Sequence, residues 1–349
     1  MKKALAKIRW FLNYLSWLSR YLRLKAGFNT LRDIKIFSIE FASICNLHCK
    51  YCFLEKKDRP RYLDINVYEK LIREVASNPQ YNIKVMEWPI SGEFLIYPDH
   101  KKVIDLTKRY MDEYPHFRPH VILNENMVLM NEEKIDLILN SGVVRQLICS
   151  IDGHDAATFE EMRPPAQFNV VLKNMRLLAQ RNRDLGFPVF LQIHNGRNEN
   201  SLNKELSTEM KEIFALGNYV SFWRPKFWNE SFNHKEKRFL PAKGFCSFVF
   251  NNVTLSSSGA ISKCCMDLKG STEYADLKIH SLKEIWHSSI RKQFLTLMFR
   301  NRRDQLKGCN TCSITNTNND NRYTNWMRTL KRYRFAYAKK RGLIYDPIR

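Results

Sequence analysis

Three cysteines lie close together near the start of the chain, in the stretch SICNLHCKYC at residues 43–52. Cys45, Cys49 and Cys52 are separated by three and then two residues, and no fourth cysteine follows closely. A structural zinc site takes four protein ligands, whereas three thiolates in one loop can hold three irons of a [4Fe–4S] cluster. The spacing therefore predicts a cluster with one open iron, which can bind an exogenous chelate.

A second set of cysteines lies near the end of the chain. Cys246 and Cys264 flank the stretch around Gly259, and Cys309 and Cys312 follow after 44 intervening residues as a Cys-x2-Cys pair. The stretch FNNVTLSSSGAISKC alternates around a glycine-containing turn, so a hairpin is expected to bring Cys246 near Cys264. Four thiolates complete a closed site, which the residues alone would assign to zinc.

Strands and helices alternate between the two cysteine sets. Apolar, β-rich runs occupy residues 37–44, 83–91, 120–126, 145–153, 188–196 and 218–225. Helical periodicity separates them, for example at 65–77, 131–141 and 168–185. Six such units predict an α/β fold, a partial (β/α)6 barrel whose functional groups lie at the carboxyl ends of a parallel sheet. The three-cysteine loop follows the first strand, where such a site is expected.

Composition limits the class of protein. The 349 residues are 44% hydrophobic and include nine cysteines, which favours a folded chain with metal ligation over a secreted disulfide framework. We therefore expect a cytoplasmic protein. The net charge of +22 calls for an anionic partner. No apolar run reaches about 18 residues, so a membrane-spanning helix is not expected.

Both ends of the chain are basic and aromatic. Residues 7–24, KIRWFLNYLSWLSRYLRL, form an amphipathic helical pattern with basic residues on its polar side. Such a helix either docks on an anionic membrane surface or packs against the barrel or a partner. Residues 321–341 form a second basic, aromatic helical pattern, which we expect to add to an anion-facing surface.

The pattern Cys45-x3-Cys49-x2-Cys52, with the aromatic Tyr51 before the last cysteine, resembles the signature of the radical S-adenosylmethionine (radical SAM) superfamily. The resemblance implies that the open iron binds the amino and carboxylate groups of SAM. One electron from the cluster then cleaves SAM, and the resulting 5′-deoxyadenosyl radical abstracts hydrogen from a substrate. A one-electron reductant such as flavodoxin or ferredoxin is an implied partner.

Two further strand ends support this resemblance. Ser91-Gly92-Glu93 resembles the Gly-Gly-Glu element that receives the SAM ammonium, although serine replaces the first glycine and Phe94 stands where proline is common. Ser150 and Asp152 resemble the polar pair that contacts the ribose and carboxylate of SAM, and Arg163 is a candidate anion partner.

The second cysteine set, Cys-x12-Gly-x4-Cys followed by Cys-x2-Cys, resembles the twitch domain, a shortened SPASM domain. The resemblance implies a second, fully ligated [4Fe–4S] cluster rather than zinc. We expect an N-terminal helix at 1–34, a radical SAM barrel at 35–230, an auxiliary-cluster domain at 231–315 and a basic tail at 316–349.

Of the unassigned cysteines, Cys149 is expected to be a buried structural thiol. Cys265 is a spare ligand, a core thiol or a hydrogen donor.

An auxiliary cluster near the substrate suggests an electron acceptor. We therefore expect an oxidoreductase that acts on a sugar-like or polyol carbon, including a phosphate- or lipid-linked one. A peptide maturase or an epimerase is the alternative within enzymes. A non-catalytic basic metal protein that binds nucleic acid is the alternative of another class, favoured by the net charge and by the tyrosine- and arginine-rich tail. For an enzyme, we expect no nucleic-acid partner and a cytoplasmic location, with peripheral contact at the inner face of the membrane as an open alternative.

Overall fold

The computed structural model describes residues 31–52, 61–196, 204–223, 246, 248–267 and 270–312, and five isolated N-terminal positions. Of the helix expected over residues 7–24, only Leu15, Leu18, Ser19 and Leu22 are described, all as helical. The basic segment at 321–341 lies outside the described residues. So does the boundary near residue 230 between the two expected domains.

Six parallel strands form the main sheet, in the order in which they occur in the sequence. They are β1 (Ile36–Ile39), β2 (Val85–Trp88), β3 (His120–Glu125), β4 (Val144–Ser150), β5 (Phe190–Gly196) and β6 (Tyr219–Trp223). Each lies within or beside one of the six runs expected from sequence. The α/β prediction of a partial barrel is confirmed.

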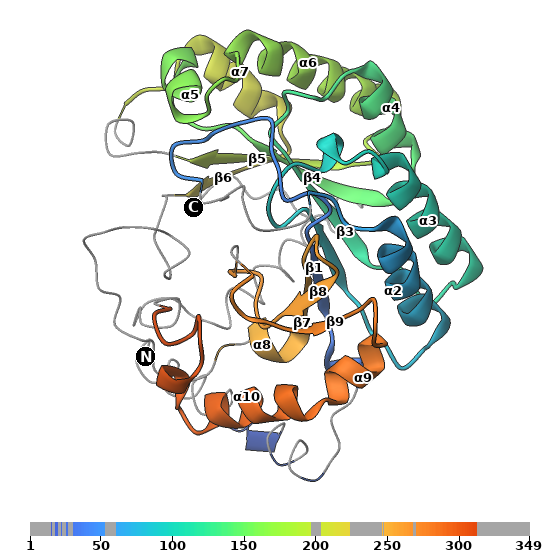
Figure 1. The fold of residues 1–349 in the computed structure, drawn as a ribbon. Helices are drawn as coiled ribbons and strands as arrows, with labels where there is room; N and C mark the ends of the chain where they lie inside the picture. Colours follow the sequence, from blue (N-terminus) through green and yellow to red (C-terminus); the bar gives the residue numbers. More distant parts are fainter. Residues whose placement is uncertain are drawn as a thin grey trace, which may run out of the picture.

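Helices cover one face of this sheet as an outer arc (Figure 1). They are α2 (Ile65–Ser77), α3 (His100–Glu113), α4 (Glu132–Asn140), α5 (Ala156–Met162), α6 (Phe168–Asp184) and α7 (Thr208–Leu216), with short 3-10 turns η1 (Leu31–Asp33) and η2 (Phe94–Ile96). Side-chain caps fix several starts, since Asp64, Asn131 and Ser207 each accept a hydrogen bond from the first turn of the following helix.

The two faces of the sheet differ in polarity. On the helix-covered face, alternate residues such as Phe37, Trp88, Leu123 and Leu147 are fully buried in the main core. This core includes Cys149, so the expectation of a buried structural thiol is confirmed. On the opposite face, alternation brings out polar side chains beside a small buried apolar cluster, because successive strand residues point to opposite sides. The cluster consists of Ile36, Val85, Ile122 and Ile148. That inner face is where the carboxyl-end site opens.

The auxiliary region continues the same sheet. It contains α8 (Phe248–Asn251), β7 (Asn252–Leu255), β8 (Ala260–Ser262), β9 (Glu273–Asp276), α9 (Leu282–His287), α10 (Ser289–Phe299) and η3 (Arg303–Gln305). β7 pairs in parallel with β1, and β8 and β9 add antiparallel strands to give nine in all. The expected hairpin is present, but its first strand begins only at Asn252, after α8. The continuation of the barrel sheet was not predicted.

Residues 281–299 have a continuous helical pattern in the sequence, but they form two helices rather than one. Ser288 is extended, with φ −61° and ψ 152°, and separates α9 from α10. Its side chain accepts a hydrogen bond from the Arg291 amide and so begins a new helix, while Ser281 and Glu284 form a capping box at the start of α9. Serine at both helix starts is the physical reason for the break.

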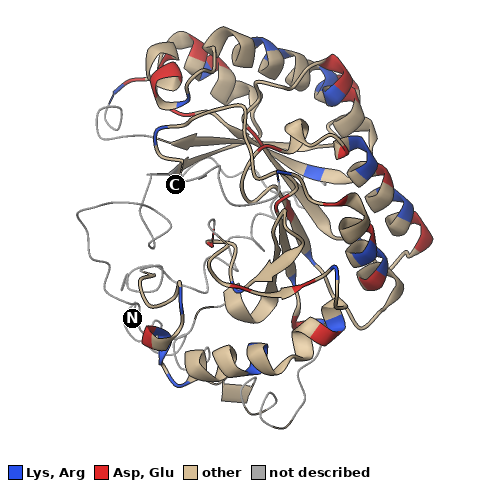
Figure 2. Cartoon of the chain, in the orientation of Figure 1, with Lys and Arg blue, Asp and Glu red and all other residues tan. Residues whose placement is uncertain are grey.

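The basic excess of the chain lies mostly outside the described residues. These carry 30 Lys and Arg against 28 Asp and Glu, whereas the whole sequence has 57 against 35. Figure 2 shows both signs mixed along the outer helices. The positive charge is therefore concentrated in the N-terminal segment, residues 224–245 and the C-terminal tail. Among the described residues, none of the helices has the length and apolar character to cross a membrane.

Candidate active site

The three-cysteine loop begins a few residues after β1. Cys45 and Cys49 are half-buried and Cys52 is exposed. The Cys45 sulfur accepts a hydrogen bond from the Leu47 amide at 3.4 Å, and the Cys52 amide donates to the Cys49 carbonyl at 2.9 Å. The loop is thus folded into turns that hold the cysteines at the carboxyl end of the sheet, as expected.

Burial and charge act in opposite directions on these thiols. Burial raises the pKa of Cys45 to about 12, with a further contribution from the nearby Glu93 carboxyl. Burial also raises the pKa of Cys49, whereas the Arg163 guanidinium lowers it. Three sulfur donors beside a buried cation suit an anionic iron-sulfur cluster, which binds thiolates.

The structure brings Tyr51, Asp152 and Arg163 together, and they bind one another. The Asp152 carboxylate is fully buried, accepts from the Tyr51 hydroxyl and pairs with Arg163 Nε at 2.6 Å. Its second oxygen accepts from the Gly196 amide at 2.5 Å. These contacts fasten the cysteine loop to the ends of β4 and β5. Direct contact of the three residues with SAM stays a prediction.

Backbone contacts fix the same loop on its other side. The His48 amide donates to the Pro164 carbonyl at 2.6 Å, and the Lys50 amide donates to the Met162 carbonyl at 3.0 Å. The loop therefore depends on the segment after α5, which also carries Arg163.

The segment Ser91-Gly92-Glu93 packs on the backbone that leads into the cysteine loop. Gly92 has φ +70°, and a Cβ there would lie 1.9 Å from the Ala42 carbonyl oxygen, so glycine is required. The Glu93 amide donates to the Ile44 carbonyl at 3.0 Å. The predicted SAM element and the cysteine loop are thus one hydrogen-bonded unit.

Glu125 and Asn126 at the end of β3 join this unit and were missed from sequence. Asn126 Nδ2 donates to Glu93 Oε2 at 2.7 Å and lies 3.7 Å from the Cys45 sulfur. The Glu125 carboxyl lies beside that of Glu93 and has no other hydrogen-bond partner among the described residues. The signal was available, since NEN at 124–126 is a polar strand end of the kind that carries barrel sites.

Burial raises the pKa of both carboxyl groups. The Glu93 charge raises the pKa of Glu125 further, whereas the hydrogen bond with Glu125 lowers that of Glu93. Glu93 is therefore the carboxyl of the pair that ionises first as the pH rises. An ammonium group is the natural partner for this ionised carboxylate.

Ser150 ends β4 on the inner face, in register with His194 of β5. It is half-buried and lies two residues before the fully buried Asp152, which follows the strand. The structure thus places the predicted polar pair at the strand end, with Ser150 nearer the inner face.

The four auxiliary cysteines line one cavity, together with Lys263 and Arg303. Burial raises the pKa of Cys246 to about 12 and that of Cys309 to about 11, and the Arg303 charge opposes the shift in both. Four thiols with two cations suit an anionic, fully ligated cluster. Cys265 hydrogen-bonds the Cys264 thiol and does not line the cavity.

Both Cys-x2-Cys pairs use the same turn. The Cys312 amide donates to the Cys309 carbonyl at 3.3 Å, as the Cys52 amide does to Cys49. Within the described part of the chain, no three Cys, His, Asp or Glu side chains converge on one point as they would around a single metal ion. A four-iron cluster instead binds each thiolate at a different iron.

Family models decide the relationship. The radical SAM superfamily model matches residues 39–204, and the model of an iron-sulfur cluster-binding domain, SPASM, matches residues 246–313. The chain belongs to the radical SAM superfamily. It is a radical SAM enzyme, so the alternative of a non-catalytic nucleic-acid-binding protein is wrong. SAM and iron-sulfur chemistry follow from the two matches, and the number and type of clusters remain proposals.

Solved structures share the fold of this radical SAM enzyme. BtrN in complex with AdoMet and 2-DOIA is 15% identical with a TM-score of 0.50, over 80% of this chain and 92% of BtrN. Native anSMEcpe with bound AdoMet is 14% identical with a TM-score of 0.58, over 88% and 100%. Streptococcus suis SuiB bound to precursor peptide SuiA is 12% identical with a TM-score of 0.58, over 78% and 68%. No curated protein sequence matches the enzyme significantly.

Glu93 and Glu125 give a matched pair of substitutions for the SAM site. Glu93→Gln removes the ionised carboxylate, so we expect SAM binding to weaken by about 1.5–3 kcal/mol, the range for a hydrogen bond to a charged group. Glu125→Gln mimics the protonated acid and should leave SAM affinity and iron content unchanged. Equilibrium dialysis of reconstituted protein measures both. Equal affinities of Glu93→Gln and the wild type would show that Glu93 does not meet the ammonium.

The same pair predicts a pH dependence of stability. Because the pKa of Glu125 is raised on folding, its contribution is full at acid pH and is lost as pH rises from the unfolded value toward the folded one. At pH 7 folding must either bury the Glu125 charge or protonate this carboxyl, and the neutral amide of Glu125→Gln avoids that cost. The variant should therefore stabilise the apoprotein at pH 7 by about 1–3 kcal/mol, and much less near pH 4.5. Urea unfolding at the two pH values checks this. A pH-independent difference would contradict it.

Proposed function

We propose that this radical SAM enzyme oxidises a polar, sugar-like or polyol carbon. The observation that carries the proposal is the polar inner face of the barrel, opposite the helix-covered core. Glu87, Asn124, Ser150 and His194 are half-buried there, toward the carboxyl ends of four adjacent strands. A face with carboxylate, amide, hydroxyl and imidazole groups suits a substrate with several hydroxyl or amino groups.

A chain of hydrogen bonds orders this face across four strands. His120 Nε2 lies 3.1 Å from Gln146 Oε1, Gln146 donates to Gln192 at 2.7 Å, and Gln192 donates to Ser221 at 2.7 Å. Ser221 Oγ is 2.8 Å from His194 Nδ1. Burial lowers the pKa of His120, which keeps that end of the chain neutral. This series of hydrogen bonds holds the His194 ring in one orientation. It therefore supports a role for His194 as a fixed polar contact for the substrate.

We assign a SAM-binding [4Fe–4S] cluster to Cys45, Cys49 and Cys52 and an auxiliary one to Cys246, Cys264, Cys309 and Cys312. When bound, the first cluster and SAM supply the radical that takes a hydrogen atom from the substrate. An alcohol carbon that has lost this hydrogen atom becomes a carbonyl by losing one proton and one electron. A cluster held by Cys246, Cys264, Cys309 and Cys312 would accept this electron, and polar groups of the inner face would accept the proton.

Oxidation predicts a product two hydrogens lighter than the substrate, with no solvent deuterium at the attacked carbon. The test is anaerobic turnover in heavy water with SAM, dithionite and a panel of polyols and aminocyclitols that includes 2-DOIA, followed by mass spectrometry. If Cys265 instead repairs the radical, the product is an epimer that carries one deuteron, and Cys265→Ala abolishes this label.

A peptide arm tests the alternative of a maturase. The Kp18Cys peptide, with which anSMEcpe has been solved, is incubated under the same conditions. Formation of 5′-deoxyadenosine that responds to peptide and to none of the polyols would overturn the proposal. The basic composition of the segments outside the described residues favours an anionic partner, which adds phosphate- and lipid-linked sugars to the panel.

A further inference from the structure

Glu40 lies where the barrel meets the auxiliary region, and it belongs to neither cysteine set. It directly follows β1 and is fully buried. One carboxylate oxygen accepts a hydrogen bond from the Ser91 hydroxyl, and the other accepts from the Ser257 amide at 3.0 Å. The Glu40 amide also donates to the Leu255 carbonyl of β7 at 2.9 Å. A single carboxylate thus joins segments that are 51 and 217 residues away in sequence.

Each arm of this junction leads to a different cysteine set. Ser91 opens the Ser91-Gly92-Glu93 segment, which packs on the backbone preceding Cys45. Ser257 lies in the turn between β7 and β8, and β8 ends two residues before Cys264. The contact also accounts for the departure from the family pattern at residue 91, since a glycine there would leave Glu40 without this hydroxyl.

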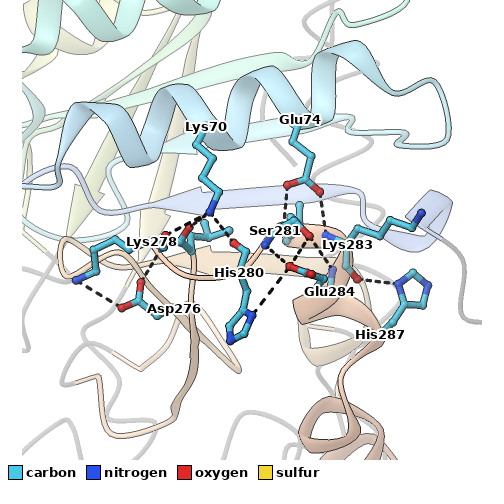
Figure 3. A network of polar contacts seen from close by, with 11 residues as sticks. Lys70, Glu74, Asp276, Lys278, His280, Ser281, Lys283, Glu284 and His287 are labelled. Carbon is cyan, nitrogen blue, oxygen red and sulfur yellow. Dashed lines mark hydrogen bonds and ion pairs between the residues drawn. The ribbon is translucent and has the colours of Figure 1, made fainter.

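The auxiliary region has a second attachment, at a different place. On α2, Lys70 Nζ donates to the carbonyls of Leu277 and His280 at 2.6 and 3.1 Å, and Glu74 accepts from the amides of Leu282 and Lys283 at 2.8 and 2.9 Å (Figure 3). Glu74 therefore holds the start of α9. It touches neither the cysteine loop nor the Ser91 segment in any of these contacts, so it serves as a control for general anchoring.

We propose that Glu40 is a positioning residue that couples the SAM-binding segment to the auxiliary iron-sulfur region. The proposal rests on the assignment of Ser91-Gly92-Glu93 to SAM and of the hairpin cysteines to the second cluster. A buried carboxylate makes strong hydrogen bonds with fixed geometry, because it has two acceptor oxygens and no donor. Tightening of the Ser91 arm on SAM binding is transmitted through Glu40 to the β7–β8 turn.

Glu40→Gln breaks the coupling with little change in size. The glutamine amide keeps one acceptor oxygen for the Ser257 amide and presents an NH2 donor to Ser91, so the charged hydrogen bond from Ser91 to Glu40 is lost. Ser91→Ala removes one arm and leaves the Ser257 contact. Glu74→Gln weakens the other attachment and leaves Glu40 intact.

Hydrogen exchange of the reconstituted full-length protein, with and without SAM, provides the test. We expect SAM to slow exchange of amides in residues 256–264 about fivefold or more in the wild type and in Glu74→Gln, in line with typical coupling between sites. At SAM concentrations that saturate each variant, this protection should disappear in Glu40→Gln and in Ser91→Ala, while iron content stays at the wild-type level.

The possible outcomes test the SAM-site assignment and the coupling separately. Absence of SAM binding to the wild type would overturn the site assignment itself. SAM binding without protection of residues 256–264 in the wild type would overturn the coupling, as would equal protection in Glu40→Gln. If Glu40→Gln proves unstable, Ser91→Ala alone decides, because it leaves Glu40 bound to the hairpin: retained protection there overturns the proposal.

Discussion

Replacing Cys246, Cys309 and Cys312 by alanine is expected to halve the iron of anaerobically reconstituted protein, from about eight to about four per chain, because each four-iron cluster needs its own thiolates. These cysteines line one cavity with Cys264, and burial keeps their environment closed to solvent. Iron and zinc analysis with Mössbauer spectroscopy measures the change.

Cys149→Ala is the matched control. Cys149 is fully buried in the main core and belongs to neither set, so this variant should retain all of the iron. One equivalent of zinc in the wild type, lost together with the three cysteines, would overturn the assignment of an auxiliary cluster and restore the zinc interpretation.

The second large effect is expected at Asp152. Asp152→Asn leaves the Arg163 guanidinium buried without its charge partner, so we expect a loss of about 3–5 kcal/mol in the free energy of unfolding. Because Tyr51 and Arg163 hold the cysteine loop through this carboxylate, the iron of the SAM cluster should fall as well. Urea unfolding of the apoprotein and iron analysis after reconstitution measure the two effects separately.

Glu212→Gln provides the control for this experiment. Arg176 binds Glu212 through two hydrogen bonds of 2.6 and 2.7 Å, but both side chains are solvent-exposed. Exposed ion pairs contribute about 0–1 kcal/mol, so this variant should unfold almost like the wild type. Similar losses of unfolding free energy in the two variants would show that the buried Asp152–Arg163 pair stabilises the fold no more than an exposed ion pair does.

Local signals in the sequence predicted most of the barrel. Strand runs such as 120–126 and helix 65–77 agree closely with β3 and α2, because alternation and amphipathic periodicity are local properties that burial enforces. The break at Ser288 was missed, since apolar periodicity continues across it and only the cap residue marks a new start.

The site was predictable where its chemistry depends on spacing within one loop. Cys45, Cys49 and Cys52 form such a pattern. Gly92 was also predictable, because its backbone must approach Ala42 too closely for any side chain. Glu40 and Glu125 were not found. Their roles depend on contacts with Ser257 and Glu93 across strands distant in sequence, and pairings of that kind leave no periodic signal.

The central claim is that Cys45, Cys49 and Cys52 hold the cluster that cleaves SAM, while the auxiliary set does not. Reductive cleavage of SAM to 5′-deoxyadenosine by the two triple alanine variants tests it most directly. The variant lacking Cys246, Cys309 and Cys312 should still form 5′-deoxyadenosine with dithionite. The variant lacking Cys45, Cys49 and Cys52 should form none, although it retains about four irons in the auxiliary site. Cleavage by the second variant, or its loss in the first with the SAM-site iron intact, would contradict the account.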